Sequence, residues 1–412
     1  MLRRILKDET DQMDLDTGVW KPFAFAPPPE VEKPTYKIVG SNERYDCRDH
    51  VFARMAMKKE SPPYEDYYRR HPERKPLDDE NRERAQRSGM KLVQRDPINE
   101  WLAISGFSRA WIMSRPDYLN HKAKMLVQPV GRVHQEKVHP DPQQMTRKIK
   151  ALGLHLGGGK VRIANLAQRW VYTHKPVPEY GEPYHLDYPY VICLAVPQSP
   201  FFMDNHTGLS ENWEVGWSYS YATFISYAIA DYIRTLGWDA RAIPTLNTPY
   251  LVAPLFVDCG IGEDGRCGYT VSKEFGNNWR PGGIATDLPL VPDKPVDFGL
   301  QDFCDKCGIC AEACPSGAIP KEDREVVRGY KKWHIDAEKC YAYWNTTGHS
   351  CGVCQSVCPW SHVNTWFHKG VREVAQRFPL LRKSLVKAEE IFYSHQAKPE
   401  PKWMTEEVAF SS

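Results

Sequence analysis

Two runs of cysteine near the C-terminus constrain this chain more than any other feature. The first run reads Cys-x2-Cys-x2-Cys-x3-Cys-Pro and the second reads Cys-x10-Cys-x2-Cys-x3-Cys-Pro. Closely spaced thiolates converge from a tight loop on one 4Fe–4S cluster, while the cysteine before proline is carried to the neighbouring cluster. The spacing therefore predicts two clusters that exchange one ligand each. The ligands would be Cys304, Cys307, Cys310 and Cys358 for cluster one, and Cys340, Cys351, Cys354 and Cys314 for cluster two.

Zinc sites and disulfides are the alternative uses of these cysteines. Zinc sites are built from paired Cys-x2-Cys knuckles rather than from triplets closed by Cys-Pro. Disulfide frameworks are typical of small secreted chains, not of a chain with 412 residues. Both runs therefore favour iron–sulfur clusters and a role in transferring single electrons. The remaining cysteines are expected to be ordinary buried or free thiols: Cys47, Cys193, Cys259 and Cys267.

Length, net charge and the distribution of apolar residues limit the classes of protein to which the chain can belong. The length of 412 residues predicts two or three domains. The formal net charge of +2 gives no sign of a nucleic-acid or membrane-surface partner. No stretch of about 18 apolar residues exists, so no transmembrane helix is expected. Twin arginines at positions 3 and 4 precede acidic residues rather than an apolar stretch, which favours a cytoplasmic protein. The alternative is an exported mature form, peripheral to the membrane, from which a leader has been removed.

The distribution of charged residues, proline and apolar strands divides the chain into four parts. Residues 58–98 are dense in charge and proline, and they predict a solvated arm or a wrapping segment rather than a core. Apolar strands begin only after about residue 140. The expected parts are an N-terminal wrapping region at 1–139, an α/β core at 140–298 with a loop insertion at about 170–188, a ferredoxin-type domain at 299–365 and a helical tail at 366–412.

Hydrophobic periodicity and the positions of glycine and proline predict the helices and strands of the core. A helix should open at Asp141-Pro142 and end at Gly153. A second helix should begin near 216–221 and run to Leu236, with Gly237 as its C-terminal stop. Strands are expected at 160–166, 190–196, 241–245, 269–272 and 284–290, and the second of them should be buried on both faces.

A further pattern lies directly upstream of the cysteines. A glycine-punctuated stretch at 254–270 is followed by Glu-Phe-Gly-x-x-x-Arg at 274–280 and by Thr-Asp-Leu-Pro-Leu at 286–290. This order resembles the corrinoid-dependent reductive dehalogenases, and the likeness covers about residues 140–365. The cysteine runs alone are a weak signal for that family, because many redox proteins carry them. Their combination with the Glu-Phe-Gly motif is specific.

The resemblance implies a fold and a set of cofactors. The core would be a nitroreductase-like α/β unit with an antiparallel-rich sheet, followed by a bacterial ferredoxin-type two-cluster domain. A corrinoid of the cobalamin type would lie between the glycine-rich region and two 4Fe–4S clusters, with no histidine from the protein on its cobalt. His206 belongs to a near-match of the corrinoid-mutase motif Asp-x-His-x-x-Gly, in which the glycine comes one residue early. We therefore interpret His206 as a loop residue.

The resemblance also implies residues that act on the substrate. A tyrosine would donate a proton, and an arginine would keep that tyrosine ready to donate. An asparagine would bind the tyrosine or the substrate. These roles fall on Tyr221, Arg280 and Asn247, although Tyr219 and Tyr227 lie close to the first position. A phenol has an unperturbed pKa of about 10, so it keeps its proton until the reaction needs it. A guanidinium beside it would stabilise the phenolate left behind.

Contacts to the corrinoid are expected at positions where the backbone can approach a bulky ligand, or where an aromatic ring can wall the pocket. The glycines could equally be plain turns. The expected positions are Gly260, Gly262, Gly265, Gly268, Phe275 and Trp344. Other aromatic residues could also wall the substrate pocket: Trp20, Phe23, Phe25, Trp101, Trp111 and Trp217.

The leading hypothesis is an enzyme that replaces a carbon-bound halogen by hydrogen and releases halide. Its partners would be a small halogenated organic substrate and a low-potential donor such as a ferredoxin, a flavodoxin or a quinol-linked reductase. A membrane-anchor partner is expected only if the protein is exported. One rival is an epoxyqueuosine-reductase-like enzyme, which would act on tRNA with an aspartate as proton donor. The other is a non-catalytic ferredoxin-like carrier, against which about 300 upstream residues argue.

Overall fold

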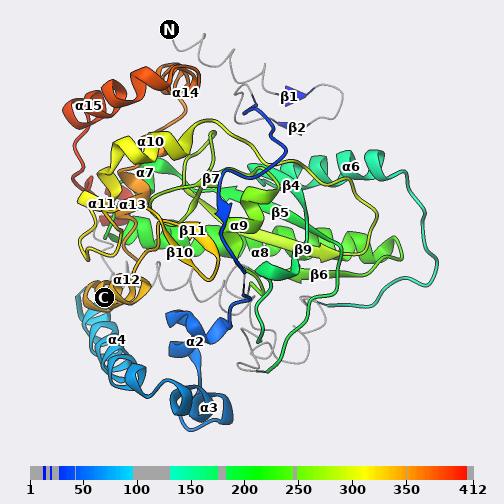
Figure 1. Cartoon of the computed structure of the whole chain (residues 1–412), viewed down its shortest axis with the longest axis horizontal. Helices are drawn as coiled ribbons and strands as arrows, with labels where there is room; N and C mark the ends of the chain where they lie inside the picture. Colours follow the sequence, from blue (N-terminus) through cyan, green and yellow to red (C-terminus); the bar gives the residue numbers. More distant parts are fainter. Residues whose placement is uncertain are drawn as a thin grey trace, which may run out of the picture.

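A computed structural model gives the fold of the chain (Figure 1). It describes residues 13–14, 19–20, 27–41, 43–95, 130–174, 182–244, 248–348 and 350–405, with only the backbone for 13–14, 19–20, 88–95 and 405. Asn247, Phe23, Phe25, Trp101 and Trp111, as well as the side chain of Trp20, therefore lie outside the described residues.

A four-stranded antiparallel sheet forms the centre of the molecule. Its strands, in spatial order, are β4 (Lys160–Asn165), β5 (Tyr190–Pro197), β9 (Trp279–Thr286) and β6 (Ala240–Ile243). In the register, Ile192 of β5 pairs with Ile163 on one side and with Ile284 on the other. All six inner residues of β5 are buried, as its unbroken apolar run predicted.

Alternating residues of β5 pack on opposite layers, as the period of two in a strand requires. Ile192 and Leu194 face a layer that includes α6 (Pro142–His155) and α8 (Leu209–Thr235). Val191 and Cys193 face a second layer with α9 (Val252–Asp258). The prediction of a mixed α/β core with an antiparallel sheet is therefore confirmed.

Short elements connect these layers. They are η5 (Gln168–Trp170), α7 (Pro200–Met203), and the hairpin strands β7 (Glu263–Asp264) and β8 (Thr270–Val271). His206 lies in the turn after α7, as expected.

Two predicted helix boundaries were wrong. The helix α6 continues through Gly153 to His155. A Cβ atom at Gly153 would lie 2.8 Å from Val161 Cγ2, so this glycine allows a close helix–strand contact rather than ending the helix. The helix α8 begins at Leu209, so Tyr221 lies more than three turns inside it rather than at its start. The predicted stop at Gly237 is confirmed, with a φ of +80°.

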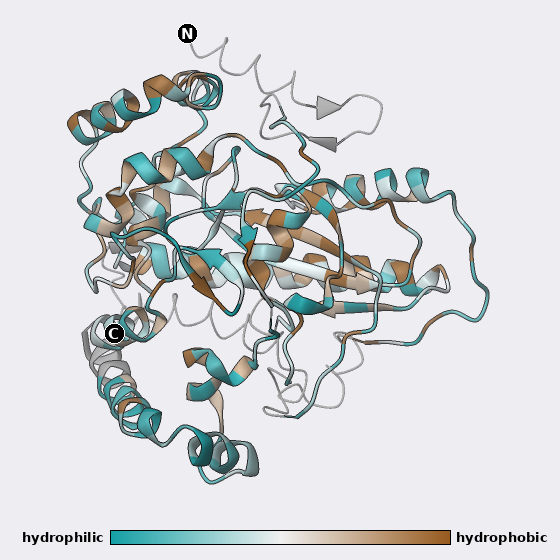
Figure 2. Ribbon diagram, viewed as in Figure 1, coloured by the Kyte–Doolittle hydropathy of each residue, from teal (hydrophilic) through white to brown (hydrophobic). Residues whose placement is uncertain are grey.

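The N-terminal part contains more packed structure than its composition predicted. Its elements are β1 (Met13–Asp14), β2 (Val19–Trp20), β3 (Lys37–Ile38), η1 (Cys47–Asp49), α2 (Val51–Ala56), α3 (Pro62–Arg70), η2 (Pro72–Arg74) and α4 (Lys75–Arg95). Figure 2 shows mainly hydrophilic outer surfaces on α3 and α4. Nevertheless, Tyr64, Tyr67 and Tyr68 form a small core, and a fully buried ion pair joins Arg54 to Asp78 at 2.7 Å. The segment therefore has a small core of its own, which the expectation of a solvated arm or wrapping segment did not include.

The cysteine runs fold beside one end of the sheet (Figure 1). This part contains α10 (Leu300–Cys307), α11 (Ile309–Glu312), β10 (Glu325–Val327), β11 (Tyr330–Lys332), α12 (Ala337–Thr347), α13 (Val353–Ser356) and η7 (Pro359–Ser361). The tail adds α14 (Trp366–Arg377), η8 (Pro379–Leu381), α15 (Arg382–Phe392) and α16 (Lys402–Thr405). Among the described residues, no helix has the length and apolar character needed to cross a membrane.

The loop between β8 and β9 joins the core to the cysteine-bearing part. Gly276 has a φ of +62°, and a Cβ atom there would lie 2.6 Å from the backbone nitrogen of Ser361. The next residue, Asn277, accepts a hydrogen bond from Ser361 Oγ at 2.7 Å. This contact fixes the strand that carries Arg280 against the segment that follows Cys358.

Candidate active site and metal centres

The two cysteine runs fold alike. In each run a longer helix is followed by a glycine with positive φ, then by a helix of four residues, and then by a Cys-Pro step. The glycines are Gly308 (φ +74°) and Gly352 (φ +65°). Left-handed backbone at these positions reverses the chain between the helices, which turns the cysteines on either side toward one another.

The structure brings together the four thiols of each predicted set. Cys304, Cys307, Cys310 and Cys358 line one small cavity. The pKa of Cys351 is raised to about 12, chiefly by burial and in part by Glu211 and the neighbouring thiols Cys340 and Cys314. The pKa of Cys354 is also raised by burial, and by the same two thiols. Raised thiol pKa values mean that metal binding must displace protons from these groups.

The two thiol sets lie next to each other. Cys354, expected in the second set, also lines the cavity of the first set. Among the described residues no cysteine forms a disulfide, and Cys47, Cys193, Cys259 and Cys267 are buried, as predicted. Across the described residues, no three His, Cys, Asp or Glu side chains converge on the position of a single metal ion.

Arg280 lies beside the second thiol set, near the start of β9, and is 7 % exposed. Its Nη1 donates to Gln198 Oε1 at 3.1 Å, and its Nη2 donates to Gln355 Oε1 at 3.2 Å. Gln198 follows β5, where the register pairs Val196 with Arg280. Gln355 follows Cys354 directly, so a single hydrogen bond connects this arginine to the backbone neighbour of a predicted cluster ligand.

The charge of Arg280 is incompletely compensated. Its buried Nε has no hydrogen-bond partner, and no carboxylate of the described residues forms an ion pair with it. Glu211 and Glu214 of α8 are close enough to be affected by its charge. Burial raises the pKa of Glu211 to about 7, whereas a hydrogen bond from Ser350 and the charge of Arg280 lower it. A desolvated cation without an anionic partner is costly unless a ligand supplies the partner.

The tyrosine at Arg280 is Tyr219, not Tyr221. The guanidinium carbon of Arg280 lies 5.1 Å from the centre of the Tyr219 ring. Residues two apart on an α-helix point about 200° from each other, and Tyr221 accordingly faces away. Its hydroxyl lies over Gly157, and its ring stacks on Trp217 at 6.0 Å. Tyr227 is buried in the layer between α8 and the sheet.

Tyr269 lies near both Arg280 and the second thiol set. Desolvation raises its pKa well above the usual value, Cys354 and Cys340 raise it further, and Arg280 lowers it. The residue is 38 % exposed. A partly exposed aromatic ring beside a buried cation is a candidate contact for a planar ligand.

The glycine-rich stretch packs against protein. A Cβ atom would lie 2.4 Å from Lys294 O at Gly260, 2.0 Å from Val271 O at Gly262, and 3.1 Å from Ile335 Cγ2 at Gly268. Gly265 lines the cavity of the first thiol set. Phe275 is buried in the core layer, and Trp344 packs against Phe52 at 5.2 Å. None of these contacts joins the expected residues to Arg280.

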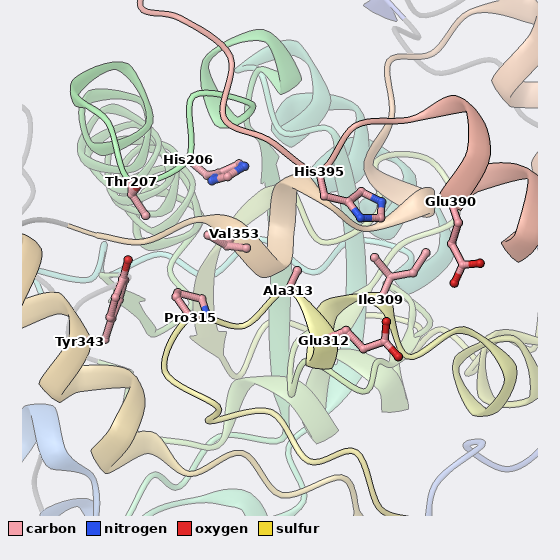
Figure 3. Close-up of a pocket in the computed structure, with 10 residues that line it drawn as sticks. All are labelled: His206, Thr207, Ile309, Glu312, Ala313, Pro315, Tyr343, Val353, Glu390 and His395. Atoms are coloured by element: carbon pink, nitrogen blue, oxygen red, sulfur yellow. The ribbon is translucent and has the colours of Figure 1, made fainter.

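A larger cavity of about 630 Å³ opens among α11, α12, α13 and α15 (Figure 3). His206 and His395 project into it from one side, and Glu312 and Glu390 border it on the other (Figure 3). Ala313 and Pro315, which flank Cys314, form part of its wall. It contains neither Arg280 nor Tyr219, so it is separate from the arginine site.

Sequence reasoning missed three residues of this site. Tyr219 was named only as a neighbour of the expected tyrosine, Tyr221, whose assignment stays a prediction. Gln198 and Gln355 carried no signal, because an isolated glutamine has no motif. Their positions follow from the β5–β9 register and from the helix after Gly352.

Comparison with known proteins gives consistent matches. The family described as 4Fe-4S dicluster domain matches residues 303–362. A tetrachloroethene reductive dehalogenase of Desulfitobacterium hafniense is 39 % identical over 198 residues, which are 45 % of this chain and 35 % of that protein. A tetrachloroethene reductive dehalogenase of Sulfurospirillum multivorans is 30 % identical over 279 residues, which are 59 % and 55 % of the two chains. The chain thus spans only about a third to a half of these curated relatives.

A solved structure shows the same fold. It is a reductive dehalogenase whose description concerns B12-dependent dehalogenation. It superimposes with a TM-score of 0.69 at 23 % identity, covering 88 % of this chain and 48 % of that chain.

Proposed function

Because the chain belongs to the reductive dehalogenase family, we propose that it replaces a carbon-bound halogen of an organic molecule by hydrogen. The reaction consumes two electrons and one proton and releases one halide ion. The substrate would be a small halogenated compound, as the names of the relatives indicate.

The buried and incompletely paired Arg280 is the observation that carries this proposal. An electron carrier has no use for a desolvated cation that faces a tyrosine, whereas an enzyme that protonates a carbon centre does. Tyr219 is the proposed proton donor, because its ring lies 5.1 Å from the guanidinium. A positive charge beside a phenol stabilises the phenolate that remains after proton transfer.

Two glutamines would hold the arginine in place. Gln198 and Gln355 each accept one N–H of Arg280, and Gln355 Nε2 donates to Asn277 O at 2.6 Å. Both side chains are nearly fully buried, so their orientation is fixed. Asn247, expected to bind the tyrosine or the substrate, stays a prediction.

The described residues fit the cofactors that the proposal requires. The two thiol sets would hold two 4Fe–4S clusters, and the dicluster match supports this use of both runs. A corrinoid would lie beside Tyr269 and Arg280, and the unpaired Nε of Arg280 and Nε2 of Gln198 fit a ligand there. The backbone of the glycine-rich stretch, Phe275 and Trp344 remain candidate contacts. When bound, these groups would supply the low-potential electrons for reductive cleavage.

The surroundings of the thiol sets suggest how they connect to a donor protein. The second set adjoins Gln355 and Arg280. In the first run, Cys307 follows the exposed residues Asp305 and Lys306. We therefore propose that a low-potential donor, such as a ferredoxin or a flavodoxin, docks near the first set.

Halide release from an anaerobically reconstituted chain tests the proposed function. The protein would be loaded with iron, sulfide and cobalamin, and assayed with a strong one-electron reductant on chlorinated, brominated and fluorinated compounds. We expect halide release that the matched variant Cys310→Ala, which removes one proposed cluster ligand, loses. Reduction of epoxyqueuosine in tRNA without halide release would favour the rival enzyme. Cluster absorbance without any corrinoid band would favour a plain carrier.

A further inference from the structure

Cys267 lies at the tip of the β7–β8 hairpin, between the two thiol sets. It lines the same cavity as the four thiols of the first set and Cys354 of the second. The two sets account for all eight predicted ligands, so this ninth thiol has no assigned use.

The neighbouring arginine fixes the hairpin tip. Arg266 is 7 % exposed, and its Nη1 donates to the carbonyls of Pro320 (3.0 Å), Lys321 (3.2 Å) and Glu322 (2.9 Å). Its Nε donates to the carbonyl of Cys304 at 3.3 Å. These bonds attach the tip to the segment that carries the first set, so Cys267 cannot turn away from the cavity.

The hydrogen bond between Asn277 and Cys267 has Asn277 as its donor and the sulfur of Cys267 as its acceptor. Asn277 is 1 % exposed, and its Nδ2 donates to Cys267 Sγ at 3.2 Å and to the carbonyl of Cys354 at 3.2 Å. The sulfur of Cys267 is therefore an acceptor on that side. The same sulfur-bearing residue lines the cavity of the first set, so its S–H can be directed toward that cavity.

We propose that Cys267 is a positioning residue that donates an S–H hydrogen bond toward the cluster held by Cys304, Cys307, Cys310 and Cys358, and so raises the reduction potential of that cluster. The inference rests on the proposed clusters. Reduction adds negative charge to a cluster, and a hydrogen bond to its sulfur atoms stabilises this charge. Four thiols of the first set and one thiol of the second line the cavity of Cys267, so its effect should be larger on the first cluster.

A redox titration of the reconstituted protein, followed by electron paramagnetic resonance, tests this role. The signal of the first cluster is identified as the one that Cys310→Ala abolishes. In Cys267→Ala the iron content should equal that of the wild type. At the wild-type midpoint, the ratio of reduced to oxidised first cluster should fall on the order of tenfold, equivalent to about 59 mV for a one-electron couple.

Two further variants distinguish this role from a merely structural one. Cys267→Ser retains a hydroxyl donor and should lie between the wild type and Cys267→Ala. Cys259→Ala removes a fully buried thiol that lies elsewhere in the core and should leave the potential unchanged.

Two outcomes would overturn the inference alone. An unchanged potential in Cys267→Ala would show that the thiol only fills space, and a loss of iron would show that it is a ligand. Absence of both cluster signals from the wild type would overturn the proposed function as well.

Discussion

The guanidinium carbon of Arg280 lies 5.1 Å from the ring centre of Tyr219, whereas Tyr221, two residues along the same helix, contacts Gly157 on the opposite face. This relationship selects one of two neighbouring tyrosines as the proposed acid. It depends on the helix phase and on the register that places Arg280 at the start of β9.

The two tyrosines form a matched pair for mutation. Tyr219→Phe should lower the rate of halide release by about 10²-fold or more, because a positioned general acid contributes about that factor. Tyr221→Phe should retain most activity, since its hydroxyl only covers Gly157. Iron and corrinoid contents should be unchanged in both variants. Loss of activity in Tyr221→Phe alone would contradict the assignment.

Arg280 and Arg266 form a second pair, because both are 7 % exposed but differ in their partners. Arg266 donates to four backbone carbonyls, and Arg266→Met should cost about 3 kcal/mol by leaving them unsatisfied. Arg280→Met also leaves the oxygens of Gln198, Gln355 and Trp279 without this donor, but it removes an incompletely compensated buried charge, so it should cost less than Arg266→Met while abolishing activity. Urea unfolding of the protein without cofactors measures both effects. An equal loss of stability in the two variants would argue that Arg280 has a structural role.

Glu263 should make stability depend on pH. Its pKa is raised to about 7, chiefly by burial and also by Asp297, against backbone hydrogen bonds from Phe298 and Leu300 that lower it. The folded state therefore holds this proton more tightly than the unfolded state, whose pKa is about 4.3. Stability from this group is present below that value and is lost as the pH rises to about 7, by up to about 3 kcal/mol.

Unfolding of Glu263→Gln between pH 4.5 and 8 tests this dependence. The variant keeps an oxygen that accepts the two backbone N–H groups, so it should flatten the slope and exceed the wild type in stability above pH 7. The exposed control Glu322→Gln should retain the wild-type slope. A wild-type slope in Glu263→Gln would refute the assignment.

Alanine substitutions at Gly276 and Gly40 distinguish the cost of backbone strain from the cost of steric overlap. Both have positive φ, +62° and +73°, but only a Cβ at Gly276 would meet other atoms. Gly40→Ala should cost about 1 kcal/mol from the left-handed backbone alone. Gly276→Ala should cost about 3 kcal/mol, because Trp360 and Ser361 must also move. Equal losses of stability in the two variants would mean that the contact between the core and the cysteine-bearing part can shift at no cost in free energy.

The features predicted best were those determined by local pattern. The cysteine runs and the Cys-Pro steps fix the order of ligands, the apolar run of β5 fixes a central strand, and Gly237 ends a helix. The failures came from packing between distant segments. Gly153 resembles a helix stop, and only the neighbouring Val161 shows that the glycine serves a close contact. The tyrosines of 58–98 appeared solvated because their partners, such as Arg54 and Asp78, pair across helices.

The site itself could be predicted only in part. Arg280 came from its motif, but its orienting glutamines depend on strand register and on the fold of the second cysteine run. The choice between Tyr219 and Tyr221 required the helix phase, which an offset counted from Asn247 does not give.

The electron stoichiometry of halide release tests the central claim most directly. The reconstituted protein would be supplied with a measured amount of one-electron reductant and an excess of a halogenated substrate. The account predicts one halide and one hydrogen-substituted product for every two electrons consumed, with one proton taken up. Consumption of electrons without halide, by a protein that contains both clusters and the corrinoid, would contradict it.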